Sequence, residues 1–381
     1  PMMRRTIFED DHELYRRAVR EFLEREITPH HDAWESAGVV SREAWLAAGA
    51  GGHLCHAVPE EYGGAGVDDF RFPVVFMEEM ADALASGPGF AVHSEMVVPY
   101  ITEYGSPEQK LRWLPGCVDG SIITAVAMSE PGTGSDLAAI STKAVRQGDS
   151  YVVNGTKTFI SNGQLADLVV VVARTSDDPH RGLSLLVIES GMEGFERGRN
   201  LEKVGMKAQD TSELFFNDVR VPEDNLIGEE GAGFLYLMSG LERERLTIAV
   251  GAVATAAKAL ALTRDYVQER TAFGRPIGRF QNSRFLMAEL ATEVQVAQVF
   301  LDRCTLELVA GRFTADTAAM AKWWCTELQL RVVDRCVQLH GGYGYMTEYP
   351  VSRAWRDIRL HTISGGTSEV MKEIIGRSLG C

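Results

Sequence analysis

The sequence has few cysteines, and their spacing does not suggest a metal site. The six cysteines among 381 residues are scattered, without the C-x-x-C spacing of zinc or thioredoxin-type sites. We therefore expect reduced thiols, no metal ion and a cytoplasmic location. The N-terminal segment lacks the apolar core of a signal peptide, and its early acidic residues are untypical of a transit peptide. The mitochondrial matrix is the expected location only if a transit peptide has been removed.

Positive charge and long apolar runs are also scarce. The 38 Lys and Arg residues against 53 Asp and Glu residues give a net charge of −15, which would repel nucleic acid and anionic membranes. The longest uninterrupted apolar run, Leu168 to Ala173, is far shorter than the roughly 18 to 20 residues of a membrane helix. Apolar residues still make up 45% of the chain, enough for the packed cores of two or three domains. We expect a soluble protein without nucleic-acid or membrane partners.

The first third of the chain has the pattern of helices. Apolar residues between Leu14 and Ile27 follow helical spacing, and Pro29 is expected to end that helix. Ser106 and Gln109 flank a proline in a capping-box arrangement, which predicts a helix toward Leu114. We expect an N-terminal helical domain over residues 1–120.

From about residue 121 the pattern becomes that of strands. Tyr151 to Val153 and Thr156 to Ser161 flank Asn154-Gly155, a dipeptide typical of type I′ turns, which predicts a hairpin. Turn residues separate three further β-rich runs, which are Leu168 to Ala173, Leu183 to Ile188 and Leu214 to Val221. We expect a middle β domain, a barrel or sandwich, over residues 121–234.

The remainder, residues 235–381, returns to a helical pattern. Segments near 235–269, 283–310 and 315–339 are longer than an average globular helix, and two shorter helices follow near 351–358 and 367–378. Long helices joined by short turns favour an antiparallel four-helix bundle. No G-x-G-x-x-G follows a predicted strand, so a Rossmann turn is not expected. The fold class that we expect is α+β, with helical, β and helical domains in that order.

Four short segments resemble the signature motifs of the acyl-CoA dehydrogenase family. They are MSEPGTGSD at 128–136, RTAFG at 270–274, QLHGGYG at 338–344 and GGTSE at 365–369. Each motif is weakly specific, but their order and spacing cover essentially the whole chain. The resemblance implies the three-domain fold above, an FAD cofactor, an acyl-CoA substrate, an electron-transfer flavoprotein as electron acceptor, and a homotetramer.

The first motif has the composition of a loop that suits an anionic group. Its glycines and proline favour exposed backbone N–H groups, although an ordinary surface turn has the same composition. The resemblance implies that Met128 and Ser129 face the flavin pyrimidine and that Gly134 belongs to the same cofactor loop. Ser135 is placed near a pyrophosphate, and it is a candidate for both cofactor and substrate binding.

Phe159-Ile160-Ser161 resembles the family's Trp-Ile-Thr. The resemblance implies that Phe159 packs on the isoalloxazine ring with Ile160 beside it, and that Ser161 hydrogen-bonds flavin N5. Phenylalanine lacks the indole N–H, so a contact that needs this donor is not expected here. The pattern alone also fits a strand whose aromatic and aliphatic residues lie in the core.

The C-terminal motifs imply a second set of cofactor contacts. Arg270 resembles the residue that clamps the FAD pyrophosphate of a neighbouring subunit, a task suited to a planar, permanently charged donor group. Without the resemblance, Arg270 would be read as an ordinary solvated arginine. The other cofactor contacts that the resemblance implies are Phe273, Gln281, Gln338, Gly341, Gly342, Thr367 and Glu369.

The last motif lacks the glutamate that many family members use as catalytic base, because Gly365 stands in its place. The isovaleryl- and long-chain-type branches carry their base on a long C-terminal helix, just before an arginine, and the resemblance places it at Glu244, before Arg245. Helical spacing makes Glu244 the odd charge on a face formed by Leu241, Ile248, Gly251 and Thr255. The surrounding Glu-Arg-Glu-Arg run also fits a solvated, ion-paired helix face.

The resemblance also assigns substrate contacts around this base. It makes the N–H of Gly365 one donor to the thioester oxygen, and the loss of a glutamate side chain there is expected to free volume for a bulkier acyl group. Arg245 is expected to act electrostatically and Glu242 to contact the CoA arm, with Gly366 as a further substrate contact.

These observations predict an FAD-dependent acyl-CoA dehydrogenase that forms a trans-2-enoyl-CoA. Glu244, with its pKa raised by burial, would remove the α-proton while the β-hydride passes to flavin N5. One alternative is a relative that uses dioxygen, as acyl-CoA oxidases and nitroalkane oxidases do, although this chain is shorter than typical acyl-CoA oxidases. The other alternative is a non-catalytic subunit that binds flavin or CoA.

Overall fold

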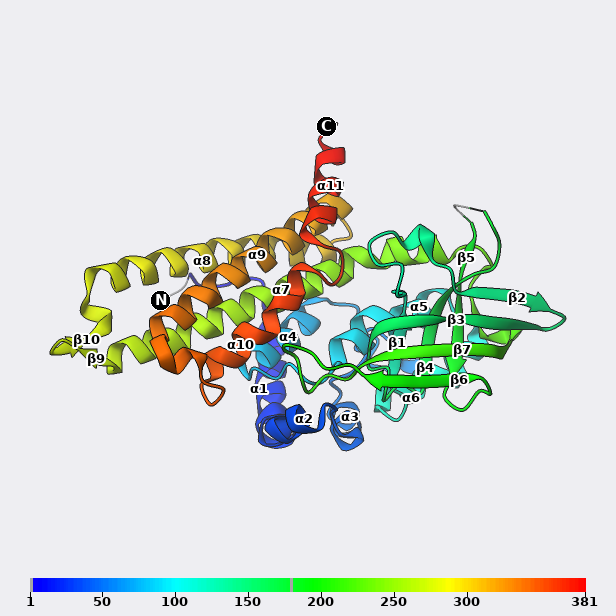
Figure 1. The fold of residues 1–381 in the computed structure, drawn as a ribbon, viewed down its shortest axis with the longest axis horizontal. Helices are drawn as coiled ribbons and strands as arrows, with labels where there is room; N and C mark the ends of the chain where they lie inside the picture. Colours follow the sequence, from blue (N-terminus) through cyan, green and yellow to red (C-terminus); the bar gives the residue numbers. More distant parts are fainter. Residues whose placement is uncertain (1–2, 179–180) are drawn as a thin grey trace.

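The computed structural model describes residues 3–178 and 181–381 and divides the chain into three parts (Figure 1). A β domain lies at one end and a long helical bundle at the other, with the N-terminal helices against both. The predicted α+β class, with helical, β and helical parts in chain order, is confirmed. The boundaries drawn at residues 120 and 234 stay a prediction.

The N-terminal third is helical, as predicted. The capping box forms, because Ser106 Oγ accepts from the Gln109 N–H at 3.2 Å and Gln109 Oε1 accepts from the Ser106 N–H at 3.0 Å. The first helix continues as a π-helical segment to Ile27 and ends before Pro29, as expected; Pro29 lies in the first turn of a new 3₁₀ segment, where proline is tolerated. The helices are α1 (Asp10–Phe22), α2 (His31–Ala37), α3 (Arg42–Ala50), α4 (Arg71–Asp82), α5 (Val98–Tyr104) and α6 (Pro107–Asp119).

The β domain is one sheet in two halves that meet at a single β2–β4 residue pair. Strands β4 and β5 are buried along nearly their whole length, because one face packs in the β core and the other against the N-terminal helices. Burial on both faces explains their continuous apolar runs. The strands are β1 (Thr124–Ala127), β2 (Lys143–Gln147), β3 (Ser150–Ser161), β4 (Leu168–Arg174), β5 (Leu183–Glu189), β6 (Phe195–Asn200), β7 (Thr211–Pro222) and β8 (Leu226–Ile227).

The predicted hairpin at Asn154-Gly155 is wrong. Strand β3 runs unbroken through this pair, and the tight turn joins β2 to β3 at Gly148, which has a φ of +67°. Asn154-Gly155 instead forms a bulge at which the register with β7 shifts. A Cβ on Gly155 would lie 2.4 Å from Thr142 Oγ1, so the glycine permits a close approach between segments rather than a reversal of the chain.

The C-terminal part contains the predicted long antiparallel helices. Helix α7 is its central element, because it packs against α8 and α9 within the bundle and also against α4 and β5 of the other two parts. A two-stranded hairpin, β9 (Thr271–Ala272) and β10 (Arg275–Pro276), follows α7 at the far end of the bundle (Figure 1). The helices are α7 (Gly233–Glu269), α8 (Gln281–Val309), α9 (Ala315–His340), α10 (Pro350–Ile358) and α11 (Ser368–Ser378).

Helix α7 is long and apolar enough to cross a membrane by length and composition. It owes this apolar character to its central position, since it contacts α4, α5, α8, α9 and α10 as well as strand β5. A buried core helix meets the same criteria as a membrane span. We therefore interpret α7 as the core helix that holds the three parts together.

Candidate active site

Glu244 is a buried carboxyl group on α7. Its residue is only 7% exposed, and burial raises the pKa of its side chain to about 7, although Tyr100 and Arg245 both act to lower it. The Tyr100 hydroxyl donates to Glu244 Oε1 at 3.1 Å. The alternative interpretation, a solvated glutamate on an ion-paired helix face, does not hold for Glu244, because the residue is buried and its carboxyl group bonds to Tyr100.

Tyr100→Phe is expected to raise the pKa of Glu244 further, because the lost hydrogen bond stabilises the ionised carboxylate. A base must be deprotonated to act, so the acid limb of the kcat/KM–pH profile should move to higher pH. The expected shift is about 1 to 2 pH units, since a hydrogen bond to a charged group contributes roughly 1.5–3 kcal/mol and one pKa unit corresponds to about 1.4 kcal/mol. An unchanged profile in a folded, FAD-loaded variant would contradict the assigned contact.

The turn of α7 that carries Glu244 is fixed by its neighbour in sequence. Arg243 donates to Glu95 Oε2 from both Nε (3.0 Å) and Nη2 (2.8 Å), and Glu95 lies in the π-helical turn directly before α5. Tyr100 is on α5, so the ion pair and the Tyr100–Glu244 hydrogen bond join the same two elements. Neither Tyr100 nor Glu95 is predictable from local sequence, because each lies more than a hundred residues from its partner on α7.

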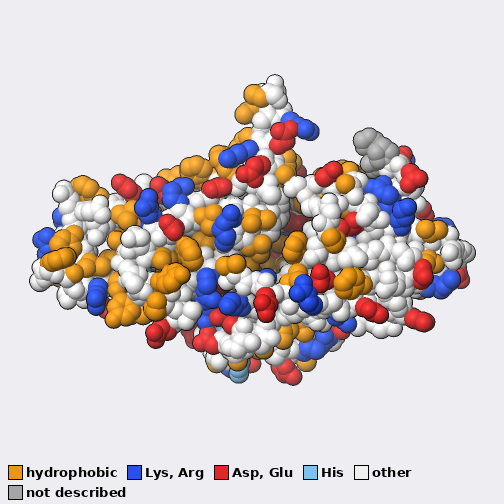
Figure 2. All heavy atoms as spheres, in the orientation of Figure 1, with side chains coloured by type: hydrophobic (Ala, Val, Ile, Leu, Met, Phe, Trp, Pro, Cys, Tyr) orange, Lys and Arg blue, Asp and Glu red, His pale blue; other side chains and the backbone are white. Residues whose placement is uncertain are grey.

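Gly365 lies against the same face of α7 as Glu244. A Cβ on Gly365 would be 2.4 Å from Cδ1 of Ile248, which follows Glu244 by one helical turn. We expected the missing side chain to leave free volume, but the Ile248 side chain occupies the space directly beside the Gly365 Cα. Gly365 also has a φ of +65°, which favours glycine. Figure 2 shows the surface hollowed nearby, between the base of α11 and the β domain.

The other predicted substrate residues lie beside this turn. Arg245 is 6% exposed, and its Nε has no hydrogen-bond partner among the residues that the structure describes. Glu242 lies on the same turn of α7, two residues before Glu244; it is partly exposed, and burial raises its pKa. The carbonyl oxygen of Gly366 accepts from Lys322 Nζ at 2.5 Å.

The predicted cofactor loop at 128–136 leaves the end of β1. Gly134 and Ser135 are exposed, whereas Met128 and Ser129 are half-buried. The expectation of exposed backbone N–H groups is wrong at Glu130 and Thr133, which bond to each other's carbonyl oxygens at 2.9 and 3.0 Å.

A buried ion pair that sequence reasoning missed supports this loop. Lys157, fully buried on β3, donates to the Met128 carbonyl at 2.8 Å and to Glu130 Oε1 at 2.9 Å. Burial lowers the pKa of Lys157 to about 8, while Ser141, Thr142 and Lys157 bring that of Glu130 to about 2 against the effect of burial. The sequence did offer one sign of this ion pair, which is a lysine, Lys157, in a β-rich run two residues before Phe159.

Phe159 is an exposed aromatic residue in a strained backbone conformation. Its φ is +60°, and 70% of the residue is exposed, while Ile160 beside it is buried and Ser161 half-buried. The strained residue lies where the β3–β7 register shifts between Lys157 and Ile160. The alternative that these strand residues lie in the core is therefore wrong for Phe159 and correct for Ile160. An exposed ring held at a positive φ is typical of a ligand contact.

Phe159→Ala is expected to weaken FAD binding by roughly tenfold to a hundredfold, because stacking and burial of one aromatic ring contribute on the order of 1.5–3 kcal/mol. The FAD-free protein should keep its unfolding free energy within about 0.5 kcal/mol, since an exposed ring contributes little to folding. Val145→Ala, at an exposed apolar residue of the same domain, is the control. Flavin fluorescence titration measures the affinities, and equal affinity in both variants would contradict the ring's role.

Most of the remaining predicted cofactor residues lie at the far end of the bundle. A cleft of about 460 Å³ is lined there by Arg270, Gln338, Gly341 and Gly342, with Tyr343 beside them. The Arg270 guanidinium lies 5.5 Å from the Tyr343 ring centre. Phe273 is 95% exposed in the β9–β10 hairpin, and exposed Gln281 begins α8 at the same end.

This cleft lies far from Glu244 along α7. The 26 residues from Glu244 to Arg270 span about 39 Å of helix axis at 1.5 Å per residue. Thr367 and Glu369 are also remote from the cleft, at the start of α11, where Thr367 Oγ1 accepts from the Val370 N–H at 3.3 Å.

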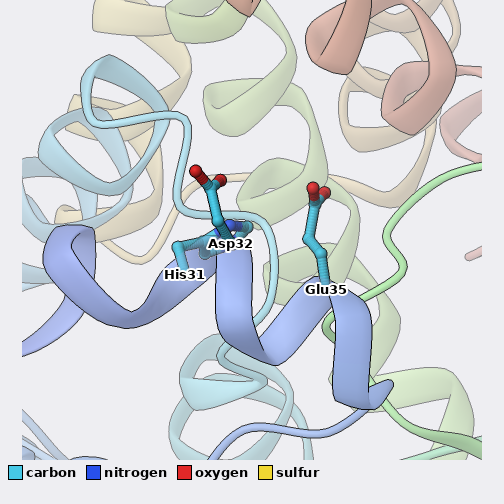
Figure 3. A group of neighbouring side chains, drawn as sticks. All are labelled: His31, Asp32 and Glu35. Atoms are coloured by element: carbon cyan, nitrogen blue, oxygen red, sulfur yellow. The ribbon is translucent and has the colours of Figure 1, made fainter. Parts of the chain in front are cut away.

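A possible metal-binding group, His31, Asp32 and Glu35, lies on α2 (Figure 3). The two carboxylates point the same way, but both already pair with the Arg353 guanidinium. His31 Nε2 accepts from the Gly87 N–H at 3.0 Å. Because an arginine already supplies the positive charge, we assign no metal to this group.

Comparison with known proteins identifies the family. Models of the acyl-CoA dehydrogenase N-terminal, middle and C-terminal domains match residues 9–121, 125–219 and 231–380. The chain belongs to the acyl-CoA dehydrogenase family, whose members are flavin-dependent oxidoreductases.

Similar proteins come from the branches that the sequence indicated. Mitochondrial long-chain specific acyl-CoA dehydrogenase of Mus musculus is 47% identical over 98% of this chain and 88% of its own. Mitochondrial isovaleryl-CoA dehydrogenase of Oryza sativa is 36% identical over 98% and 92%. The crystal structure of an acyl-CoA dehydrogenase from Geobacillus kaustophilus has a TM-score of 0.96, with 50% identity over 98% of this chain and 99% of that one.

Proposed function

We propose that this chain oxidises an acyl-CoA thioester to its trans-2-enoyl-CoA, with Glu244 as the general base. The observation that carries the proposal is a buried glutamate with a pKa near 7 on the same face of α7 as the Gly365 turn. A base whose pKa lies near the working pH accepts protons efficiently, and about half of it is still deprotonated at neutral pH.

The residues around Glu244 can lower the barrier to α-proton removal. A C–H group beside a thioester is a very weak acid, so negative charge that develops on the carbonyl oxygen must be stabilised as the proton leaves. A preorganised backbone N–H at Gly365 would donate to that oxygen, and such donors typically contribute several kcal/mol. The Tyr100 hydrogen bond holds one oxygen of Glu244 and leaves the other available for the substrate.

The residues present fit FAD, which when bound would supply the acceptor for the β-hydride. Phe159 offers an exposed ring, and Ser129 and Ser161 on neighbouring segments offer hydroxyls. The Gly341–Gly342 turn would leave room for a phosphate group, since a Cβ on either glycine would meet no atom within 4 Å. Arg270 would supply the charge for a pyrophosphate.

The division of these residues between two ends of the chain supports an oligomer with shared cofactor sites. Figure 2 shows hydrophobic side chains gathered over the helical bundle. The outer face of α8 also carries exposed apolar residues, which are Phe285, Val296, Val299, Leu306 and Val309. Such a surface favours association. We propose a homotetramer in which Arg270 of one subunit binds the FAD of another.

Anaerobic titration of the FAD-loaded protein with a panel of acyl-CoAs tests the proposal. Loss of flavin absorbance with at least one straight or branched acyl-CoA, and recovery of an α,β-unsaturated product, is the expected result. Absence of bleaching with every member of the panel would overturn the proposal and favour a non-catalytic subunit.

The oxidase alternative is tested by comparing turnover in air with turnover under argon in the presence of an electron-transfer flavoprotein. We expect the flavoprotein to support turnover without oxygen. Oxygen-dependent turnover with hydrogen peroxide as product would favour the oxidase.

A further inference from the structure

Lys322 is a buried lysine behind the Gly365–Gly366 turn. The residue has no exposed surface, and it extends from α9 so that its Nζ donates to the Gly366 carbonyl at 2.5 Å. Lys322 is the only charged residue in the Ala315-to-Thr326 stretch of α9 apart from Asp316 in the first turn. Burial of an ammonium group is costly, and one carbonyl contact compensates only part of that cost.

A second buried cation lies close to the first. Arg245 on α7 lowers the pKa of Lys322, after burial, and the two effects bring that pKa to about 8. No hydrogen bond or ion pair of the Arg245 guanidinium is found within the described part of the chain. The acidic groups that face the two cations are Glu242 and Glu244 on α7, Glu327 on α9 and Glu369 on α11, and buried His361 lies on the 3₁₀ segment after α10.

None of these acids forms a hydrogen bond or ion pair with either cation among the residues that the structure describes. Glu327 Oε1 already accepts from the Ser368 hydroxyl at 2.6 Å, and Glu369 is exposed. The turn also leads into the N-terminus of the eleven-residue α11, where the helix dipole adds partial positive charge. The Lys322 ammonium group and the N-terminus of α11 therefore both lie directly behind the turn whose N–H would face the thioester oxygen.

We propose that Lys322 is a positioning residue for the reaction, which fixes the Gly365–Gly366 turn and holds positive charge behind the thioester oxygen as the α-proton leaves. This inference rests on the proposed function. Lys322 acts through the Gly366 carbonyl and does not touch the substrate. Its charge lowers the free energy of the enolate more than that of the neutral thioester, so it should raise kcat more than it changes KM.

A 3-thia-acyl-CoA is the probe for this inference. Sulfur replaces its β-carbon, so it can lose an α-proton to the base but has no β-hydride to transfer. Its bound enolate is followed by the charge-transfer absorbance beside oxidised flavin as a function of pH. Lys322→Met should raise the apparent pKa of the bound analogue by about one unit, which is a tenfold change in its ionisation constant.

Three further variants separate charge from structure. Lys322→Arg keeps the charge and should retain most of the wild-type ionisation, whereas Lys322→Gln keeps a donor without charge and should resemble Lys322→Met. Lys372→Met removes an exposed lysine of α11 as the matched control, and it should leave the pKa of the analogue unchanged. If Lys322→Met fails to fold, comparison of the analogue's pKa in Lys322→Gln and Lys322→Arg tests the role of the charge.

Two outcomes would overturn the inference or the proposal beneath it. An unchanged ionisation constant in the Met and Gln variants, with only thermal stability lowered, would assign Lys322 a structural role and overturn the inference. A wild-type protein that neither ionises the analogue nor is bleached by any acyl-CoA would instead overturn the proposed function.

Discussion

Glu244→Gln is expected to retain FAD but to lose flavin bleaching by acyl-CoA, with the reduction rate lowered by roughly a thousandfold or more. A general base contributes on the order of 10²–10⁴ in rate, and the amide cannot accept the α-proton. The neutral side chain should also be tolerated at a buried position where burial already disfavours the charged carboxylate. Rapid-mixing absorbance under anaerobic conditions measures the rate.

Glu242→Gln is the matched control for this change. Glu242 lies on the same turn of α7 but is partly exposed, and we assign it to the CoA arm. The control should raise KM for acyl-CoA and leave the limiting reduction rate within a few-fold. If Glu244→Gln is bleached as fast as wild type, another group accepts the proton.

Arg270→Met is expected to weaken FAD binding by roughly tenfold to a hundredfold. A hydrogen bond to a charged group contributes about 1.5–3 kcal/mol, and methionine preserves much of the side-chain length without the guanidinium. Arg275→Met, on the same hairpin, is the control, because Arg275 lies over Phe280 and outside the cleft at Gly341–Gly342. Equilibrium dialysis of FAD compares the two variants.

The shared site gives the Arg270 prediction a second consequence. In a mixed oligomer of Arg270→Met and Glu244→Gln subunits, some sites combine an intact Glu244 from one subunit with an intact Arg270 from the other. Such a mixture should be more active than either variant alone. Activity that never exceeds the weighted mean of the two variants would contradict a cofactor site built from two subunits.

Elements set by local pattern were predictable from the sequence. The capping box at Ser106 and the long amphipathic stretches depend on neighbours a few residues apart, and both form as expected. Asn154-Gly155 shows the limit of this reasoning, because the same dipeptide suits a type I′ turn and a bulge. The close approach of Thr142 selects the bulge, and a contact between segments is invisible to a local pattern.

The candidate site was predictable in part. The family resemblance placed the base at Glu244, and helical spacing supported it as the odd charge on an apolar face, although the Glu-Arg-Glu-Arg run also fitted a solvated face. The depth of its burial depends on α5 and the Gly365 turn. Tyr100 lies 144 residues before its partner Glu244 and carries no local signal. Lys322 did carry a signal, as a lone lysine in the apolar first half of α9, and its contact with Gly366 emerges only when α9 meets the C-terminal turn.

The most direct measurement of the central claim is the exchange of α-hydrogens of a bound 3-thia-acyl-CoA with deuterated water. This exchange requires the base but no oxidation, so it isolates the group on α7 from every later step. Wild-type protein should exchange the α-hydrogens and Glu244→Gln should not, with FAD bound equally in both. Exchange at the wild-type rate in Glu244→Gln would show that the α-proton leaves to a different residue.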